Sequence, residues 1–450
     1  MTVVKIRKGF DVPIHGGLES VVPEDGPAIR HVALKPQEAW GIKVKLHVHI
    51  GQKVRLGEPL FHDKRDEAVQ FTAPGAGEVV AIHRGKRRMV QSVVIRLDDS
   101  EEQVPFAALD PVHADADAIR GHLLLSGLWP CLRQRPYDTI ARSNEDPLAI
   151  FVTATETRPL APPPLAVLEG REAHFRAGLV AMTKLSSGNV HLCTADGGDW
   201  GGFQVDGVRH TRFAGKHPAG NVGVHINALE PVGAGRTVWH VGYQDLADIG
   251  EFLSTGHIPT RRTVALVGPA VTRPALLRTR RGASTEELTA GRLAEGEALR
   301  LVSGSVLGGW TAQPGTAYAF LGRWDNMLSV LSDAVKRDFL GWLNPLGSRH
   351  TFTNSALAKF LRRRFDFDTD TNGGDRAIVP IGSYDQVMPM DILATPLIKA
   401  LASGDLEQAE KLGVLELAEE DLALCEYVCP SKIPVTSLLR DMLERIEKEG

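Results

Sequence analysis

The feature that most constrains this chain is a pair of cysteines near its C-terminus, Cys425 and Cys429, which Pro430 follows directly. Their C-x3-C-P spacing is that of the last two thiolates in a C-x2-C-x2-C-x3-C-P run, which holds an iron–sulfur cluster. The first two cysteines of such a run are absent, and the other cysteines, Cys131 and Cys193, lie far upstream. We therefore predict that Cys425 and Cys429 are reduced residues packed in a helical end domain. A cluster shared with another chain is the alternative.

Length and composition bound the class of protein. A chain of 450 residues should fold as about three domains. The net charge of −4 gives no overall basic surface for nucleic acid. Four cysteines are too few for a disulfide framework, so a reducing compartment is expected. We find no signal-peptide core at the start and no stretch of ~20 apolar residues, so we expect no transmembrane segment.

Residues 1–105 have the pattern of a small β-barrel. The run G-x-x-V-x-x-G-x-x-L over Gly51–Leu60 precedes Asp63-Lys64 and then A-P-x-x-G-x-V over Ala73–Val79. This order resembles the biotinyl/lipoyl barrel-sandwich fold, in which glycines form the turns. In carrier domains of that fold the lysine bears the prosthetic group. Lys64 follows Leu60 by only four positions, so we favour a solvated structural lysine over a modified one.

Residues 106–257 alternate between strands and helices, which favours an α/β, Rossmann-like domain with a parallel sheet. No G-x-G-x-x-G follows a strand and no P-loop motif occurs, so nucleotide binding by those motifs is unsupported. The predicted strands are Leu148–Thr153, Val190–Thr194 and Thr237–Val241, and the predicted helices are Ala114–Leu125 and Leu165–Leu185.

Residues 258–322 read as strand, Gly268-Pro269 turn, strand, and then a Gly-x-Ser-Thr sequence that opens a helix. This order resembles the SLBB module, a β-grasp fold, with Ser284 or Thr285 as the helix cap. Residues 323–450 are predicted to be a helical C-terminal domain with a ferredoxin-like remnant, and Gly404-Asp405 marks a break followed by an N-cap. The predicted helices are Met327–Leu340, Ser355–Arg364, Asp391–Ala402, Leu406–Leu412, Glu419–Val428 and Val435–Lys448.

Three further patterns suggest additional hypotheses. His47 and His49 could chelate a metal from one face of a strand, but a third ligand is not visible. The acidic loop Asp196–Gly202 lacks calcium-loop spacing and is interpreted as a surface loop. The basic stretch Lys359–Phe365 fits a solvated or salt-bridged face better than a membrane patch. We assign no catalytic, cofactor-binding or metal residues.

The order of the modules resembles one family, NqrA of the Na+-translocating NADH:quinone reductase, over nearly the whole chain. The two ends of the chain are the most diagnostic parts. The sequence pieces that carry the resemblance are Lys5–Ile14, Phe61–Lys64, Phe71–Pro74, Leu128–Pro130, Arg133–Pro136, Cys425–Pro430 and Leu438–Gly450.

This family is similar to RnfC and to the flavin-binding subunit of complex I, which carry a glycine-rich loop for FMN and NADH and cysteine-ligated clusters. The matching loop here is Gly127–Arg133, where Trp129 and Pro130 replace glycines and Cys131 follows. Backbone N–H groups cannot approach a phosphate there as closely as in a glycine loop. The alternative is an RnfC-like redox subunit that binds flavin or a cluster itself.

The resemblance implies a peripheral subunit on the cytoplasmic face of a six-subunit sodium-pumping NADH:ubiquinone oxidoreductase. Its partners would be the other subunits, chiefly the membrane subunits, and not nucleic acid. The chain would hold no cofactor of its own, because the flavins and iron–sulfur centres are expected on partner subunits. A contact with ubiquinone is the one small-molecule role that the resemblance allows, in an apolar cleft with one or two polar anchors.

Overall fold

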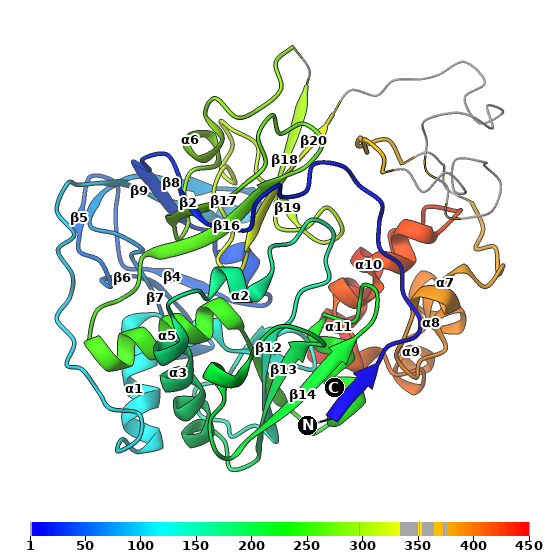
Figure 1. Cartoon of the computed structure of the whole chain (residues 1–450), viewed down its shortest axis with the longest axis horizontal. Coiled ribbons are helices and arrows are strands. Elements are labelled where there is room, and N and C mark those ends of the chain that lie inside the picture. The colour runs from blue at the N-terminus through cyan, green and yellow to red at the C-terminus, as the bar shows by residue number, and fades with distance from the viewer. Residues whose placement is uncertain are drawn as a thin grey trace.

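The computed structural model describes residues 2–296, 298–333, 350, 352, 364–371, 374 and 376–449 (Figure 1). Over these residues the fold is mixed α/β with helices near the C-terminus. The helix predicted over Ser355–Arg364, and the basic stretch that overlaps it, lie outside the described residues except at their C-terminal ends.

A barrel-like N-terminal domain is built from two antiparallel sheets that share one apolar core. Their orders are β3-β9-β8-β5 and β4-β6-β7. Phe61 and Phe71 stack between neighbouring strands with ring centroids 4.7 Å apart. Lys64 lies exposed in the tight turn that joins β6 to β7. The strands are β3 (His31–Leu34), β4 (Val44–Leu46), β5 (Lys53–Val54), β6 (Pro59–Asp63), β7 (Asp66–Thr72), β8 (Gly77–Arg84) and β9 (Val90–Leu97).

The second domain is a largely parallel sheet covered on both faces. Alternate residues of β12 point to opposite faces: Ile150 and Val152 join the core with α3 and α5, whereas Ala149 and Phe151 pack with α4. Figure 1 shows α3 and α5 side by side against one face. The strands are β10 (Arg133–Arg135), β11 (Thr139–Ile140), β12 (Ala149–Ala154), β13 (Asn189–Ala195), β14 (Val208–Ala214) and β15 (Val238–Gly242), and the helices are α1 (Ala116–Ser126), α2 (Pro164–Val167), α3 (Glu172–Leu185), α4 (Val222–Leu229) and α5 (Tyr243–Thr255).

The three predicted strands of this domain are confirmed as β12, β13 and β15. The helix predicted over Leu165–Leu185 is instead two helices, α2 and α3, separated where Gly170 takes a positive φ of 73°. The sheet order is β1-β14-β13-β12-β15-β10-β11. Its first strand, β1 (Thr2–Lys5), comes from the extreme N-terminus and pairs in parallel with β14.

The third sheet has the order β19-β18-β20-β16-β17-β2 and packs against α6. Ser284 caps α6 by accepting a hydrogen bond from the Glu287 amide, as the sequence predicts. The elements are β2 (Glu24–Asp25), β16 (Arg261–Val267), β17 (Ala275–Arg280), β18 (Leu299–Ser303), β19 (Trp310–Thr311), β20 (Met327–Ser332) and α6 (Thr285–Thr289).

The prediction of a helix beginning at Met327 is wrong. Residues Met327–Ser332 form β20, which lies between β16 and β18 in the sheet. The strand is buried on both faces, so its sequence is an unbroken apolar run. Such a run does not show whether it is strand or helix, because it has neither period. The rest of that predicted helix, beyond Asp333, lies outside the described residues.

The C-terminal end is a helical cluster with its own apolar core. The sequence predicts the bounds of α10 correctly, and Asp405 caps α9 by accepting from the Gln408 amide at 3.0 Å. Cys425 and Cys429 are buried in this core, where the Tyr384 hydroxyl lies 2.9 Å from the Cys429 Sγ. The helices are α7 (Ser383–Val387), α8 (Ala394–Ser403), α9 (Leu406–Lys411), α10 (Glu419–Val428) and α11 (Val435–Glu449).

Candidate functional site

A large cavity opens at the carboxyl ends of β12 and β15, which are parallel neighbours. From β12 the chain crosses to β13 on one side, and it later returns through α4 to β15 on the other side. The loops after the two strands therefore diverge, and open α/β sheets bind ligands at such a point. The cavity has a volume of about 1320 Å³ and is also bounded by the third sheet and by α10 and α11.

A chain of buried and half-buried polar groups lines one wall of this cavity. Asn326 donates to the Tyr243 hydroxyl at 2.8 Å and accepts from Arg158 at 3.1 Å. Glu156 pairs with Arg158 and accepts from Asn326. Burial would raise the pKa of Glu156, but the Arg158 guanidinium beside it holds that pKa below its usual value. Because these groups are partnered with one another, they fix the wall in a single arrangement.

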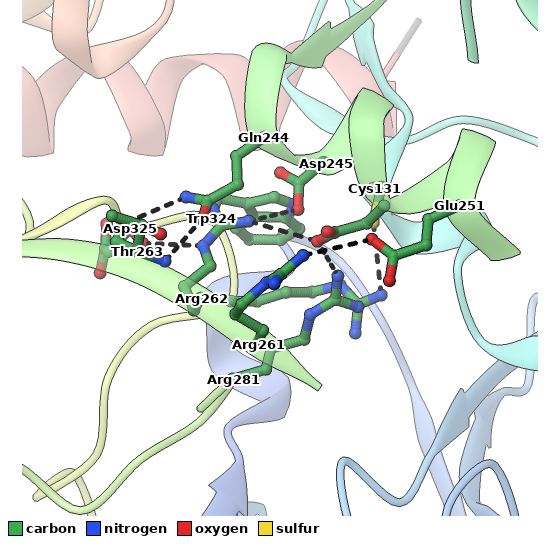
Figure 2. Close-up of polar contacts among 12 residues, drawn as sticks. Cys131, Gln244, Asp245, Glu251, Arg261, Arg262, Thr263, Arg281, Trp324 and Asp325 are labelled. Atoms are coloured by element: carbon green, nitrogen blue, oxygen red, sulfur yellow. Dashed lines mark hydrogen bonds and ion pairs between the residues drawn. The ribbon is translucent and has the colours of Figure 1, made fainter. Parts of the chain in front are cut away.

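A row of acids on α5 fastens the second domain to the third sheet. Asp245, Asp248 and Glu251 are spaced by three residues, so they lie on one face of the helix. Arg262 donates to Asp245 at 2.7 Å, and Arg281 pairs with Asp248. Figure 2 shows Asp245 directed from α5 toward Arg262, and Glu251 toward Arg261. We call this set the α5 clasp, and it comprises Asp245, Asp248 and Glu251 with Arg171, Arg261, Arg262 and Arg281.

A second buried ionic cluster fastens the helical end to the second domain. Arg135 on β10 is fully buried, and its guanidinium contacts Asp421 at 3.1 Å and Glu420 at 3.2 Å in the first turn of α10. It also contacts Asp138 at 3.3 Å. Arg133 and His240 hold the other side of Asp138. We call this set the α10 clasp, and it comprises Arg133, Arg135, Asp138, His240, Glu420 and Asp421.

Aromatic rings form the rim of the cavity. Trp40 from the barrel lies against Trp310 of β19, with ring centroids 5.6 Å apart. The Arg440 guanidinium of α11 lies 4.5 Å from the centre of the Trp40 ring, and the Arg133 guanidinium lies 5.0 Å from that of Trp324. Residues from all four parts of the chain therefore meet at this rim.

The loop Gly127–Arg133 reaches the cavity only with Cys131 and Arg133. Gly127 ends α1 at a φ of 72°, and Trp129 is fully buried with its ring 5.4 Å from that of Trp239. The bulky residues of this loop thus fill the core and do not face the cavity. Burial raises the pKa of the Cys131 thiol, and Arg323 lies 3.7 Å from its sulfur.

The other sequence candidates are not brought together at the cavity. His47 contacts His62 at 2.8 Å, whereas His49 is exposed and contacts the Ile50 carbonyl. The loop Asp196–Gly202 buries Trp200 and otherwise lies at the surface. Among the described residues, no group of three or more His, Cys, Asp or Glu side chains is placed to hold a metal ion.

Sequence reasoning missed the residues that line the cavity. The sequence could have indicated them only through their position. Thr155 and Glu156 come just after the predicted strand Leu148–Thr153, and Tyr243 comes just after the predicted strand Thr237–Val241. Arg135 carried no signal of a role at the site, since its partners Glu420 and Asp421 lie 285 and 286 positions away in sequence.

Comparisons with known proteins agree with this layout. Residues 4–98 match the NqrA N-terminal barrel-sandwich hybrid domain, 114–258 the NqrA second alpha/beta domain, and 263–313 the NQRA C-terminal domain. Three similar proteins are each named as the A subunit of the Na(+)-translocating NADH-quinone reductase. They come from Pseudomonas aeruginosa (47% identical), Serratia proteamaculans (46%) and Yersinia pseudotuberculosis (45%), and each alignment covers 100% of both chains.

Among solved structures, an NAD+-reducing NiFe hydrogenase matches 51% of this chain and 48% of its own, at 16% identity and a TM-score of 0.37. In the part of the chain that the structure describes, no helix is long and apolar enough to cross a membrane.

The barrel-sandwich hybrid domain, the α/β domain and the C-terminal domain, in that order, define the class: a multidomain α/β protein whose domains converge on one cavity. Full-length identities of 45–47% make the assignment specific. The chain belongs to the NqrA family, and the resemblance seen in the sequence is confirmed.

Proposed function

We propose that this chain acts as the NqrA component of a sodium-pumping NADH:quinone oxidoreductase. The observation that carries the proposal is the full-length identity of 45–47% to proteins of that name. The chain takes part in electron transfer from NADH to ubiquinone, coupled to Na+ export, as one component of the complex. It works with the other subunits, chiefly the membrane subunits, as a peripheral component on the cytoplasmic side.

In this proposal the chain holds no flavin or iron–sulfur centre, and these groups reside on partner subunits. Two observations support it: Trp129 occupies the position of the glycine loop, and Cys425 and Cys429 pack inside the helical core. The alternative of an RnfC-like redox subunit is not favoured by the comparisons. Pure protein should be colourless and free of iron, whereas a visible flavin or cluster spectrum would revive that alternative.

We also propose the finer organisation expected from the sequence, with a Rossmann-like second domain, an SLBB β-grasp module and a helical end that keeps a ferredoxin-like remnant. The bounds that the sequence predicts are 1–105, 106–257, 258–322 and 323–450. We extend the third part through Ser332, because β20 belongs to its sheet. We assign β1 to the second part and β2 to the third, because each pairs with a sheet outside the barrel.

The cavity is our candidate for a ubiquinone contact. It has the mixed lining such a ligand needs, with Trp40 and Trp324 as apolar surface and Tyr243 as a polar anchor. A photoreactive short-chain quinone should label peptides that contain these residues in the intact complex. Labelling confined to other subunits would remove this chain from the quinone site.

Membership of the complex is tested in native membranes. An affinity tag on this chain should recover a membrane complex with sodium-stimulated NADH:quinone reductase activity, and deletion of its gene should abolish that activity until the gene is restored. A chain that is recovered only as a free protein, with the activity intact in the deletion strain, would refute the proposed role.

A further inference from the structure

The α10 clasp is unusual because its buried charges do not balance. Two guanidiniums, Arg133 and Arg135, face three carboxyl groups, Asp138, Glu420 and Asp421. His240 adds no positive charge at neutral pH, because burial lowers its pKa to about 4. A surplus negative charge is unfavourable in this cluster, because Arg135 and Asp421 are fully buried, and Glu420 and Arg133 are only partly exposed where they line the cavity.

The charges around the clasp do not remove this surplus. Arg158, near Glu420 on the cavity side, is paired with Glu156. Arg440 on α11 is paired with Glu419. The start of α4 brings only the Asn221 amide, which donates to the Glu420 carbonyl oxygen at 3.0 Å. One proton on a carboxyl group is therefore the simplest way to neutralise the cluster.

The contacts of the three carboxyl groups with the two guanidiniums show which carboxyl groups can take this proton. Asp138 contacts both guanidiniums, which hold its pKa well below the usual value although burial alone would raise it. Glu420 and Asp421 are adjacent on α10 and share Arg135. Burial and the neighbouring Asp421 raise the pKa of Glu420 to about 7. The Glu420 side chain is also 32% exposed and lines the cavity, so a proton can exchange with solvent there.

We propose that Glu420 and Asp421 share one proton at neutral pH, and that its loss loosens the contact between α10 and β10 and so opens the cavity. While the proton is bound, the clasp is neutral and the helical end stays closed on the second domain. When the proton leaves to solvent, two adjacent carboxylates compete for the single Arg135. This device is a property of the folded chain and does not depend on the proposed function.

Proton binding at Glu420 is coupled to closure of the α10 clasp, and this coupling sets the direction of the pH effect. The pKa of Glu420 in the closed state lies above its ordinary value of 4.5. The closed state is therefore favoured most at low pH, and that advantage is lost as pH rises through about 7. Opening releases this proton between about pH 4.5 and pH 7, so the opening equilibrium changes by about tenfold for each pH unit in that range. Above about pH 7 the closed state has already lost the proton, and the equilibrium levels off.

Hydrogen–deuterium exchange of the full chain between about pH 5 and pH 8 tests the proposal, with rates corrected for the intrinsic pH dependence of exchange. Amides of α10 should lose protection by about tenfold per pH unit up to about pH 7 and then level off, while those of α3, which is remote from the clasp, should show no such change. Glu420→Gln keeps the shape but cannot ionise, so α10 should stay protected throughout. Glu407→Gln, at an exposed pair on α9, should behave as the wild type.

Two results of the exchange experiment would overturn the proposal. One is equal protection of wild-type α10 and α3 at every pH, and the other is a pH dependence that Glu420→Gln leaves unchanged. If Glu420→Gln does not fold, Asp421→Asn serves as the second variant, because it also removes the competing charge. Infrared spectra of the wild type give an independent reading, since a protonated carboxyl band should disappear between pH 6 and pH 8. Its absence would also overturn the proposal.

Discussion

The α5 clasp and the α10 clasp are both buried ionic clusters that join separate parts of the chain, but their unbalanced charges have opposite signs. The α5 clasp sets four arginines against three acids, whereas the α10 clasp sets two arginines against three acids. An arginine cannot release its proton in a protein, whereas a carboxylate can take one up. Excess guanidinium is thus permanent, and excess carboxylate can be removed by protonation.

We therefore call the α5 clasp a fixed joint, because its charges do not change near neutral pH. We call the α10 clasp an adjustable joint, because protonation can change its charge. The surplus arginine of the α5 clasp, Arg261, is 53% exposed, so water compensates its charge. Burial would raise the pKa of Asp248, but Arg281 and Arg171 lower it, so Asp248 stabilises the fold above its ordinary pKa of 3.8. That contribution is lost only as pH falls below this value. Between pH 6 and pH 8 the α5 clasp should stay constant while the α10 clasp changes.

The largest expected effect is at the fixed joint. Asp248→Asn removes the carboxylate that Arg171 and Arg281 share. Arg171 keeps Glu251, but the buried Arg281 loses its acidic partner and cannot neutralise itself. We expect a loss of about 5 kcal/mol in the free energy of unfolding, measured by urea denaturation. Asp25→Asn is the matched control, because Asp25 is 88% exposed in its pair with Arg278 and should change stability by less than about 1 kcal/mol. Equal losses in both variants would contradict the buried clasp.

Arg135→Met should cost less than Asp248→Asn, although Arg135 is equally buried. The carboxyl groups that it leaves behind can take up protons, and Glu420 can turn toward the cavity. We expect a loss of about 3 kcal/mol at pH 8 and a smaller loss at pH 6. The same denaturation series at the two pH values measures this, with Arg278→Met as the exposed control. A loss that is larger at pH 6 than at pH 8 would reverse the assignment of the adjustable joint.

The packing beneath the α10 clasp can be tested without changing a charge. A Cβ on Gly223, in the first turn of α4, would lie 2.3 to 2.6 Å from the carboxyl atoms of Asp421. We expect Gly223→Ala to cost about 2 kcal/mol, because α10 must move away. Gly121→Ala in α1 is the control, since no atom lies within 4 Å of its Cβ, and it should stabilise by about 0.5 to 1 kcal/mol. If thermal unfolding shows Gly223→Ala to be as stable as Gly121→Ala, α10 does not rest on α4 at this point.

The parts of this fold that the sequence predicts are those set by local rules. The caps at Ser284 and Asp405 and the bounds of α10 depend on neighbouring residues, and they are confirmed. Local rules failed at β20, where a strand buried on both faces has no distinguishing period. The two ionic clasps could not be foreseen either. Arg135 and Asp421 are 286 positions apart, so only the folded chain brings them together.

The smallest expected effect is the one that distinguishes the α10 clasp from the α5 clasp most directly. Glu420→Gln keeps a hydrogen-bonding side chain beside Arg135 but removes the charge that is unfavourable at high pH. We expect the variant to be more stable than the wild type at pH 8 by about 1 kcal/mol, a value reduced for the partial exposure of the side chain. At pH 6 the difference should be smaller, because the folded wild type then holds its proton. It should vanish only below about pH 4.5, where Glu420 is protonated in the unfolded chain as well.

Thermal unfolding at the two pH values measures this difference, and Glu407→Gln again provides the exposed control. Stabilisation of Glu420→Gln at pH 8 combined with no change in Asp248→Asn between the two pH values would separate the two clasps as proposed. Destabilisation of Glu420→Gln at both pH values would mean that Glu420 is an ordinary ionised partner of Arg135. The α10 clasp would then be a fixed joint like the α5 clasp, with its surplus charge tolerated through solvent in the cavity.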